Sequence, residues 1–550
     1  MTNMLTYQKP RRTFEKSGAV NPEDSYYVNF ENVVNSDNQD IRTMVDRGRY
    51  FSIFSPRQSG KTTFLEGICD KLNGNPAYIA ITLSFQEYKS IAPALFYELI
   101  EKSFYSELIQ RLKAVGCEKI DAVNRFLAKH HLTNHISFRM LFEELNRIIE
   151  FKKIVIFIDE FDGIPLEELE NFLTTLRELY LKYKKIKQKA LYSVGLVGIR
   201  NITKLIVGGV SPFNIADQVN LPPFSLRNVH DLYSQYTAET NQPFKEDAVK
   251  RVYEETAGQP WLVNRLGTLL TVDIKPGTVI PITETDVEKA VSLLLKERNS
   301  HFDNLYEKAK LYKESFVEII FDNVEYNPDD EDQTWLEQYG LIKKRTAPAP
   351  GSGVPNGGNT DTEGHAAVAN NIYKARYIKT FFKEVKAYED ISPQEYALPG
   401  GRLDMERILL NFEKYIARIG VNAFYEKKKP YEKTGQFLLT AFLYQFARGG
   451  AGDLGYEVKT GLGRMDIILT YRGKKYIIET KVNRHDDVTG IINEGIKQLC
   501  SKYLATEKTG AGYLVIFDTK THVGAVCEPR YHREGDKKVT SFLIGIGRID

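Results

Sequence analysis

The sequence has few cysteines and no long apolar run, and each absence excludes a class of protein. Its 550 residues include four cysteines, which lie far apart and form no Cys-x-x-Cys pair, so neither a disulfide framework nor a zinc ribbon is indicated. No window holds 18 uncharged apolar residues, and the polar start MTNMLTYQKPRR lacks the apolar stretch of a signal peptide. The sequence therefore predicts a cytoplasmic protein without a membrane partner.

The chain also lacks a strong overall charge, but the charge is unevenly distributed. The net charge is +2, whereas residues 401–550 contain 25 Lys and Arg against 18 Asp and Glu. A basic C-terminal part favours a polyanionic partner. At about 100–200 residues per domain the length predicts roughly three or four domains, and we find no internal repeat with a period of 20–50 residues.

The sequence pattern of residues 51–300 is typical of an α/β domain. Short apolar runs alternate with helical stretches and predict buried parallel strands: FSIFS, AYIAITLSF, KIVIFIDEF, LYSVGLVGI and LIVGG. After Pro222-Pro223 the pattern is helical only, which predicts a helical lid over about 225–300. Residues 1–50 are polar and irregular, and we expect them to pack on this first domain as a lead segment.

A phosphate-binding loop is expected between the first strand and the helix that follows it. Gly60 lets backbone N–H groups approach phosphate oxygens, Lys61 reaches the β- and γ-phosphates, and Thr62 ligates Mg²⁺ at the helix N-terminus. The first glycine of the usual GxxxxGK[ST] pattern is replaced by Ser55, which leaves the phosphate-facing half intact. The residues expected to bind nucleotide here are Arg57, Gln58, Ser59, Gly60, Lys61, Thr62 and Thr63.

The apolar run 154–158 delivers two carboxylates to its C-terminal end, where open α/β sheets place their ligands. Asp159 is expected to hold Mg²⁺ and Glu160 to polarise the attacking water, so the pair indicates hydrolysis as well as binding. The alternative is a helix N-cap carboxylate with a solvent-facing neighbour.

These residues resemble the AAA-like branch of P-loop ATPases, close to the STAND and archaeal ATPase groups, over about 25–300. The segments PFNIADQVNLPPFSL and AGQPWLVNRL are similar to the family's passage into the lid. The resemblance implies that the ligand is ATP and that Arg265 senses its γ-phosphate. It is also compatible with a homo-oligomer. Residues 301–391 resemble the winged-helix module that often follows such ATPases, with 346–364 as a flexible, enlarged wing.

A second site is expected at a hairpin near the C-terminus. If Arg472-Gly473 is a two-residue hairpin loop, paired residue numbers sum to 945, and Asp466 lies directly opposite Glu479. Opposed side chains have Cβ atoms about 4.5–5.5 Å apart, close enough to share a cation. Strand alternation puts Lys481 on the same face. Two oxygen ligands beside an ammonium suit Mg²⁺-dependent hydrolysis of a phosphodiester; a hairpin with incidental surface charges is the alternative.

The order of elements over about 402–525 resembles the PD-(D/E)XK nuclease superfamily, within a domain spanning 402–550. Met465 stands where the family has Pro. The resemblance implies catalytic Lys481, metal ligands Asp466 and Glu479, and a further acidic ligand, for which Glu432 is the candidate. The residues expected to contact nucleic acid, or in two cases to support Lys481, are Gln498, Tyr503, Lys427, Lys428 and Lys429.

Together these patterns predict an ATPase joined to a Mg²⁺-dependent nuclease that acts on DNA, with defence against foreign DNA or DNA processing as the implied setting. The fold class expected is α/β: a P-loop ATPase with a helical lid, a winged-helix module and a restriction-endonuclease-like domain. A nucleotide switch whose C-terminal domain binds nucleic acid without cutting it remains an alternative, as does a regulator that acts only through the winged helix.

Overall fold

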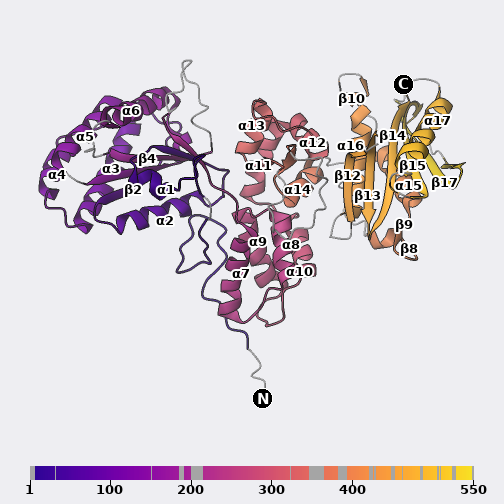
Figure 1. The fold of residues 1–550 in the computed structure, drawn as a ribbon, viewed down its shortest axis with the longest axis horizontal. Coiled ribbons are helices and arrows are strands. Elements are labelled where there is room, and N and C mark those ends of the chain that lie inside the picture. The colour runs from indigo at the N-terminus through magenta and orange to yellow at the C-terminus, as the bar shows by residue number, and fades with distance from the viewer. Residues whose placement is uncertain are drawn as a thin grey trace. The chain divides into compact units, whose positions relative to one another are not determined.

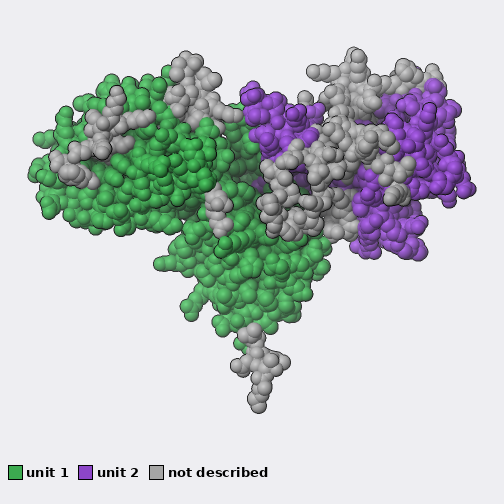
Figure 2. Space-filling view, in the orientation of Figure 1, with its two compact units in different colours: residues 1–308, 334–342, 369–372 green, residues 309–333, 343–368, 373–550 purple. Residues whose placement is uncertain are grey.

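The structure is a computed structural model. It describes residues 6–30, 33–149, 152–184, 191–199, 215–321, 324–345, 364–381, 393–419, 425–426, 429–430, 432–447, 452–460, 463–483, 487–504, 507, 509–522 and 528–547. The chain divides into two compact units (Figure 2), the first made of residues 1–308, 334–342 and 369–372, and the second of residues 309–333, 343–368 and 373–550.

The first unit contains a five-stranded sheet in the order β2-β3-β4-β1-β5, in which all neighbours are parallel. Four strands coincide with predicted apolar runs, whereas LIVGG lies outside the described residues. The strand β5 was not predicted, because its sequence DQVN buries a single side chain. The strands are β1 (Phe51–Phe54), β2 (Tyr78–Ser84), β3 (Lys153–Asp159), β4 (Leu191–Gly198) and β5 (Asp217–Asn220).

Helices cover both faces of this sheet, which explains why its strands are apolar throughout. One face packs against α1 (Ile41–Asp46) and α2 (Lys61–Asn73). The other face packs against four helices that supply most of the aromatic core: α3 (Pro93–Ala114), α4 (Ile120–Leu127), α5 (His135–Ile148) and α6 (Leu166–Lys184). Because the strands are parallel, their C-terminal ends meet at one edge, where a ligand site forms in such sheets.

The segment predicted as a lid is helical, and Figure 1 shows its helices gathered into one bundle. The bundle consists of α7 (Leu226–Thr240), α8 (Glu246–Thr256), α9 (Pro260–Thr268) with a π-helical turn η3 (Leu269–Ile274), and α10 (Glu284–Leu294). The lead segment packs on this lid: the Phe14 ring lies 4.8 Å from the Tyr26 ring and 5.5 Å from the Tyr233 ring, centroid to centroid. The indole of Trp261 donates to the carbonyl of Lys16 at 3.0 Å.

The residues after the lid form α11 (Ser300–Leu311), α12 (Lys313–Phe321), α13 (Glu331–Gln338), β6 (Ile342–Lys344), β7 (Ala366–Val368) and α14 (Asn371–Phe381). The strands β6 and β7 pair into a two-stranded sheet. The loop between them, residues 346–363 of the predicted wing, lies outside the described residues. The assignment of this module as a winged helix stays a prediction.

The second unit ends in a six-stranded sheet in the order β12-β13-β14-β15-β17-β16. The strands β12, β13 and β14 are antiparallel neighbours, β15 and β17 continue the sheet in parallel, and β16 closes the edge antiparallel. The strands are β12 (Gly452–Thr460), β13 (Gly463–Tyr471), β14 (Lys474–Asn483), β15 (Ala511–His522), β16 (Arg530–Glu534) and β17 (Lys537–Gly547).

Three helices accompany this sheet: α15 (Met405–Ile419), α16 (Glu432–Ala447) and α17 (Val488–Gln498), the last continued by a π-helical turn η8 (Leu499–Tyr503). The helix α17 connects β14 to its parallel neighbour β15, as parallel pairing requires. Short pairs β8 (Ala397–Leu398) with β9 (Arg402–Leu403) and β10 (Tyr425–Glu426) with β11 (Lys429–Pro430) complete the unit. Among the described residues, no helix is both long enough and apolar enough to cross a membrane.

Gly258, two residues before α9, allows a close backbone contact between the lid and Phe224. Its φ is +73°, and a Cβ there would lie 1.9 Å from the carbonyl oxygen of Phe224. We expect Gly258→Ala to lower the free energy of unfolding by about 3 kcal/mol or more, because backbone strain and a steric clash add. Gly277 also has a positive φ, but no atom lies within 4 Å of its Cβ position, so Gly277→Ala should cost about 1–2 kcal/mol. Equal shifts in melting temperature for the two variants would contradict this account.

Candidate functional site

The phosphate loop connects β1 to α2 and needs unusual backbone angles. Gln58 has φ +55° and Gly60 has φ +85°. A Cβ at Gly60 would lie 2.8 Å from the ring of Phe30, which comes from the lead segment. Glycine is therefore required at position 60 both by its backbone conformation and by the close approach of a side chain.

Lys61 is folded back onto its own loop. Its Nζ donates to the carbonyls of Ser55 at 2.8 Å and Pro56 at 2.6 Å. The side chain is 8% exposed, and burial lowers the pKa of Lys61 to about 8. The ammonium thus lies in a dry loop, where it donates to two backbone carbonyls and nearby Asp159 and Glu160 favour its charged form. An entering phosphate oxygen would gain a strong electrostatic partner there.

The end of β3 meets the start of α2. The Thr62 hydroxyl donates to Asp159 Oδ2 at 2.7 Å, and the amide of Glu160 donates to Asp159 Oδ1 at 2.9 Å. Asp159 is 5% exposed. Glu160 has φ +53°, a left-handed conformation at the strand end. A hydroxyl and a carboxylate held together beside the phosphate loop are the ligand types that suit Mg²⁺ with a nucleotide.

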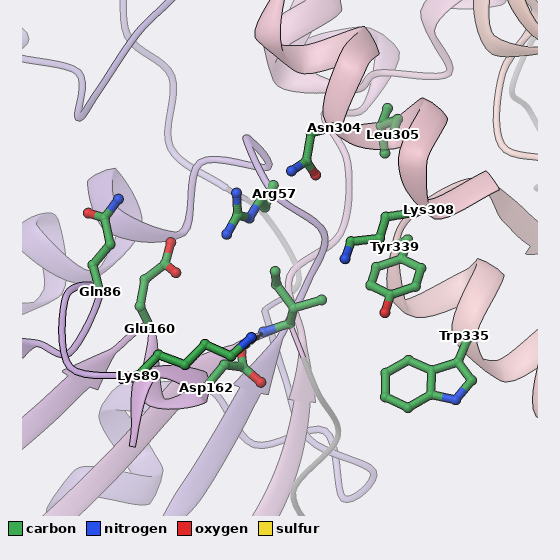
Figure 3. Close-up of a pocket in the computed structure, with 12 residues that line it drawn as sticks. Arg57, Gln86, Lys89, Glu160, Asp162, Asn304, Leu305, Lys308, Trp335 and Tyr339 are labelled. Carbon is green, nitrogen blue, oxygen red and sulfur yellow. Dashed lines mark hydrogen bonds between the residues drawn. The ribbon is translucent and has the colours of Figure 1, made fainter. Parts of the chain in front are cut away.

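Glu160 lines a cavity of about 170 Å³, shown in Figure 3. Arg57 of the phosphate loop and Asp162 lie on the same cavity, together with the residue that follows β4 and residues from α11 and from the end of α13 onward. The complete lining is Arg57, Gln86, Lys89, Glu160, Asp162, Gly163, Ile199, Asn304, Leu305, Lys308, Trp335 and Tyr339. The predicted water-polarising carboxylate therefore faces open space rather than packed side chains.

The other loop residues contact neighbouring elements. Gln58 hydrogen-bonds the ring of His301 through its side chain and accepts from Gln259 Nε2 at 3.2 Å through its carbonyl. Ser59 Oγ donates to Pro56 O at 2.7 Å. Thr63 Oγ1 accepts a hydrogen bond from the amide of Val20 at 2.9 Å. The Thr63 hydroxyl therefore binds the lead segment in this structure.

Arg265, the predicted γ-phosphate sensor, forms an ion pair in the lid. Its Nε lies 3.1 Å from both carboxylate oxygens of Glu297, and its Nη2 contacts the same group. Both side chains are about one-fifth exposed. In this conformation the guanidinium is neutralised within the lid, and a role at the γ-phosphate would require this bidentate pair to open.

The C-terminal hairpin has the predicted register. Its pairs run from Tyr471↔Lys474 to Ile467↔Ile478, and every pair sums to 945. The turn residues Arg472 and Gly473 both have positive φ, as a two-residue loop of this type requires. The pair expected next, Asp466 with Glu479, lies one step beyond the last pair of the ladder.

Asp466 lies where the two strands separate. Its Oδ2 accepts from the amide and the hydroxyl of Thr480, each at 2.7 Å. The Thr480 hydroxyl also accepts from Gln436 Nε2 at 2.6 Å, which links α16 to the hairpin. Burial raises the pKa of Asp466, and the hydrogen bonds from Thr480 offset part of the shift. Sequence patterns gave no signal for Gln436 or Thr480, because neither belongs to the charged motif.

Glu479 is 1% exposed, and its Oε2 has no hydrogen-bond partner within the described part of the chain. Burial, followed by repulsion from Asp466, raises the pKa of Glu479 to about 8. A buried carboxylate oxygen without a hydrogen-bond partner is a ligand that a cation could use.

Lys481 completes the cluster. Its Nζ lies 3.3 Å from Glu479 Oε1 and donates to Gln498 Oε1 at 2.8 Å. Gln498 Nε2 in turn donates to the Tyr503 hydroxyl at 2.5 Å. Glu494 Oε1, which the sequence did not indicate, lies 3.7 Å from the same ammonium. The two predicted residues Gln498 and Tyr503 are thus joined to Lys481 by consecutive hydrogen bonds.

The remaining predicted residues are not brought to this cluster by any described contact. Glu432 begins α16, but its side chain is outside the described part. Lys427 and Lys428 lie outside the described residues, and Lys429 lies in β11 with its side chain undescribed. Among the residues that are described, no group of three or more His, Cys, Asp or Glu side chains is placed to hold a metal. A cation here would therefore have two protein carboxylates and several waters, as Mg²⁺ usually has.

Comparisons with known proteins fit the first site and leave the second open. Residues 15–349 match a family model described as an AAA-like domain. Residues 404–521 match one described as a domain of unknown function (DUF8371). No curated protein matches the chain.

Solved structures show only distant likeness. The Walker-type ATPase PABY2304 of Pyrococcus abyssi is 12% identical with a TM-score of 0.39, and the match covers 63% of this chain and 98% of that one. For Cdc6p of Pyrobaculum aerophilum the values are 13%, 0.30, 53% and 74%. For the Aeropyrum pernix ORC1 protein in complex with DNA they are 11%, 0.29, 64% and 94%. Because the family match spans more than half of the 550 residues, the chain belongs to the AAA-like domain family.

Proposed function

We propose that the chain binds and hydrolyses ATP at its phosphate loop and cuts DNA at its C-terminal hairpin with the help of Mg²⁺. The observation that carries the second activity is the cluster around Glu479: two interacting carboxyl groups, one buried oxygen without a hydrogen bond in the described part, and an ammonium 3.3 Å away. The basic excess of residues 401–550 supports a polyanionic substrate.

At the phosphate loop, Lys61 would leave the loop carbonyls and bind the β- and γ-phosphates, while Thr62 and Asp159 would hold Mg²⁺. Glu160, facing the cavity, would orient a water and accept its proton. The water oxygen bonds to the γ-phosphorus as the bond to the bridging oxygen of ADP breaks, which releases ADP and phosphate.

At the hairpin, Asp466 and Glu479 would hold Mg²⁺, which supplies a bound water of lowered pKa. Lys481 stands beside Glu479, where its charge would stabilise the negative charge that develops on the phosphodiester oxygens. Gln498, held by Tyr503, fixes the position of the Lys481 ammonium. The attacking water would pass a proton to the solvent and its oxygen would bond to phosphorus. One ester P–O bond would break, and the leaving oxygen would take a proton from the solvent.

For the first site we expect Lys61→Ala to abolish ATP binding and hydrolysis. Glu160→Gln should retain binding but lower kcat about 100-fold or more, because general-base catalysis is lost while the phosphate contacts stay. Lys71→Ala, in the exposed last turn of the same helix, is the matched control and should behave as wild type. Hydrolysis is measured as phosphate release, and unchanged turnover in Glu160→Gln would refute the role of Glu160.

For the second site we expect Asp466→Ala and Lys481→Ala to lower cleavage of plasmid and linear DNA at least 100-fold. The first variant removes a proposed Mg²⁺ ligand, and the second removes the ammonium that would stabilise negative charge on the phosphodiester. Asp536→Ala and Lys497→Ala remove exposed charges of the same types elsewhere in the domain. These controls should cut DNA normally. Cleavage by purified Asp466→Ala protein would exclude the nuclease assignment and leave a domain that binds nucleic acid without cutting it.

The raised pKa of Glu479 predicts a pH-dependent stability without divalent cations. Between the ordinary glutamate pKa of about 4.3 and the folded value of about 8, the folded state holds a proton that the unfolded state releases. The free energy of unfolding should therefore fall as the pH rises through this window. In Glu479→Gln the fall should be smaller.

The measurement is the melting temperature from pH 5.5 to 8.5 in a chelator, for wild type and Glu479→Gln. We expect the wild type to lose several degrees relative to the variant, and Mg²⁺ to restore them. Parallel curves for the two proteins would contradict the buried position of this carboxyl group.

A further inference from the structure

The cavity beside Glu160 has two walls of different origin (Figure 3). One wall comes from the nucleotide-binding fold and carries Arg57, Glu160 and Asp162. The other comes from α11 and α13, which follow the lid in the sequence, and carries Lys308, Trp335 and Tyr339. All these residues belong to the first compact unit. A segment outside the α/β domain therefore borders the space where the γ-phosphate would be hydrolysed.

The charges around this cavity favour an anion. Arg57, Lys89 and Lys308 line it, and among the described residues none of the three has an ion-pair partner within 4 Å. Of the two carboxylates on the cavity, Asp162 accepts from the amide of Ile199 at 2.7 Å, which satisfies part of its charge. Three cations against two carboxylates leave a positive excess, which a phosphoryl group would neutralise.

Lys308 is held in a way that leaves its charge available. Its Nζ lies 5.2 Å from the centroid of the Tyr339 ring, and that ring lies nearly parallel to the Trp335 ring, 5.7 Å away. A ring face attracts an ammonium but does not neutralise it. The end of α13 also lies against the phosphate loop, because a Cβ at Gly340 would come within 2.5 Å of Pro56.

The lid arginine that was expected to contact the γ-phosphate is already paired. Arg265, which the sequence singles out as a sensor, is neutralised by Glu297 in a bidentate pair. Transfer of the γ-phosphoryl group calls for positive charge beyond the loop lysine. Lys308 can supply that charge without the loss of an existing ion pair.

We propose that Lys308 binds the γ-phosphate of ATP across this cavity, so that α11 distinguishes ATP from ADP. The inference rests on the proposed ATP site and adds to it a phosphate contact from outside the nucleotide-binding fold. Its consequence is that Lys308 contacts ATP but makes no contact with ADP and then stays on the Tyr339 ring.

The test measures the affinities of ADP and of the non-hydrolysable analogue AMP-PNP for the full chain by calorimetry. Lys308→Met keeps the aliphatic stem on the Tyr339 ring and removes the charge. We expect it to weaken AMP-PNP about 10-fold or more, since a hydrogen bond to a charged group is lost, and to change ADP affinity less than about twofold. Lys308→Arg should restore the preference for AMP-PNP, and Lys310→Ala, an exposed lysine on the same helix, should match wild type.

Two results would overturn the inference and are distinguishable from each other. If the wild-type protein binds neither nucleotide, the proposed ATP site itself is refuted. Wild type that binds both, with a Lys308→Met protein that keeps the full preference for AMP-PNP or loses both ligands equally, would show that Lys308 does not read the γ-phosphate.

Discussion

Two carboxyl groups are buried at the end of a strand pair in the C-terminal domain, and the cost of burying them shapes the candidate site. Burial raises the pKa of Asp466 and of Glu479, and the charge of Asp466 adds to the shift of Glu479. One oxygen of Glu479 also has no hydrogen bond in the described part. A divalent ion would relieve both costs at once, so the same geometry that destabilises the bare domain prepares it to bind metal.

The phosphate loop also contains a buried ionisable group, but there the group is a cation. Lys61 is almost fully buried, and burial lowers its pKa to about 8, although Asp159 and Glu160 favour the charged form. Its ammonium donates to two backbone carbonyls of the loop. An anion entering the loop would improve on those carbonyls. Each site therefore contains a buried ionisable group whose best partner is the ligand it is proposed to bind.

Much of this arrangement could be predicted from the sequence because local patterns determine it. Apolar runs revealed four of the five strands in the first sheet, and the turn Arg472-Gly473 fixed the register of the hairpin over five pairs. The strand β5 was missed because DQVN has almost no apolar pattern and depends on pairing with β1.

Other features depend on long-range packing that no motif records. The direct pairing expected for Asp466 is replaced by hydrogen bonds to Thr480, whose hydroxyl is bound by Gln436 from another helix. The sequence likewise suggested Arg265 as the phosphate sensor, because it could not show that Glu297, 32 positions later, would pair with it. Lys308 reaches the nucleotide side only through the packing of α11, and its sequence neighbourhood gives no such signal.

The most direct test of the account is a calorimetric titration of Mg²⁺, with Mn²⁺ as a second probe, into nucleotide-free protein at pH 7. The shared-cation geometry predicts one ion per chain, with release of up to one proton as Glu479 ionises, and loss of the binding signal in both Asp466→Asn and Glu479→Gln. Undiminished binding in both variants, or no binding to the wild type, would contradict a metal site between these two carboxylates.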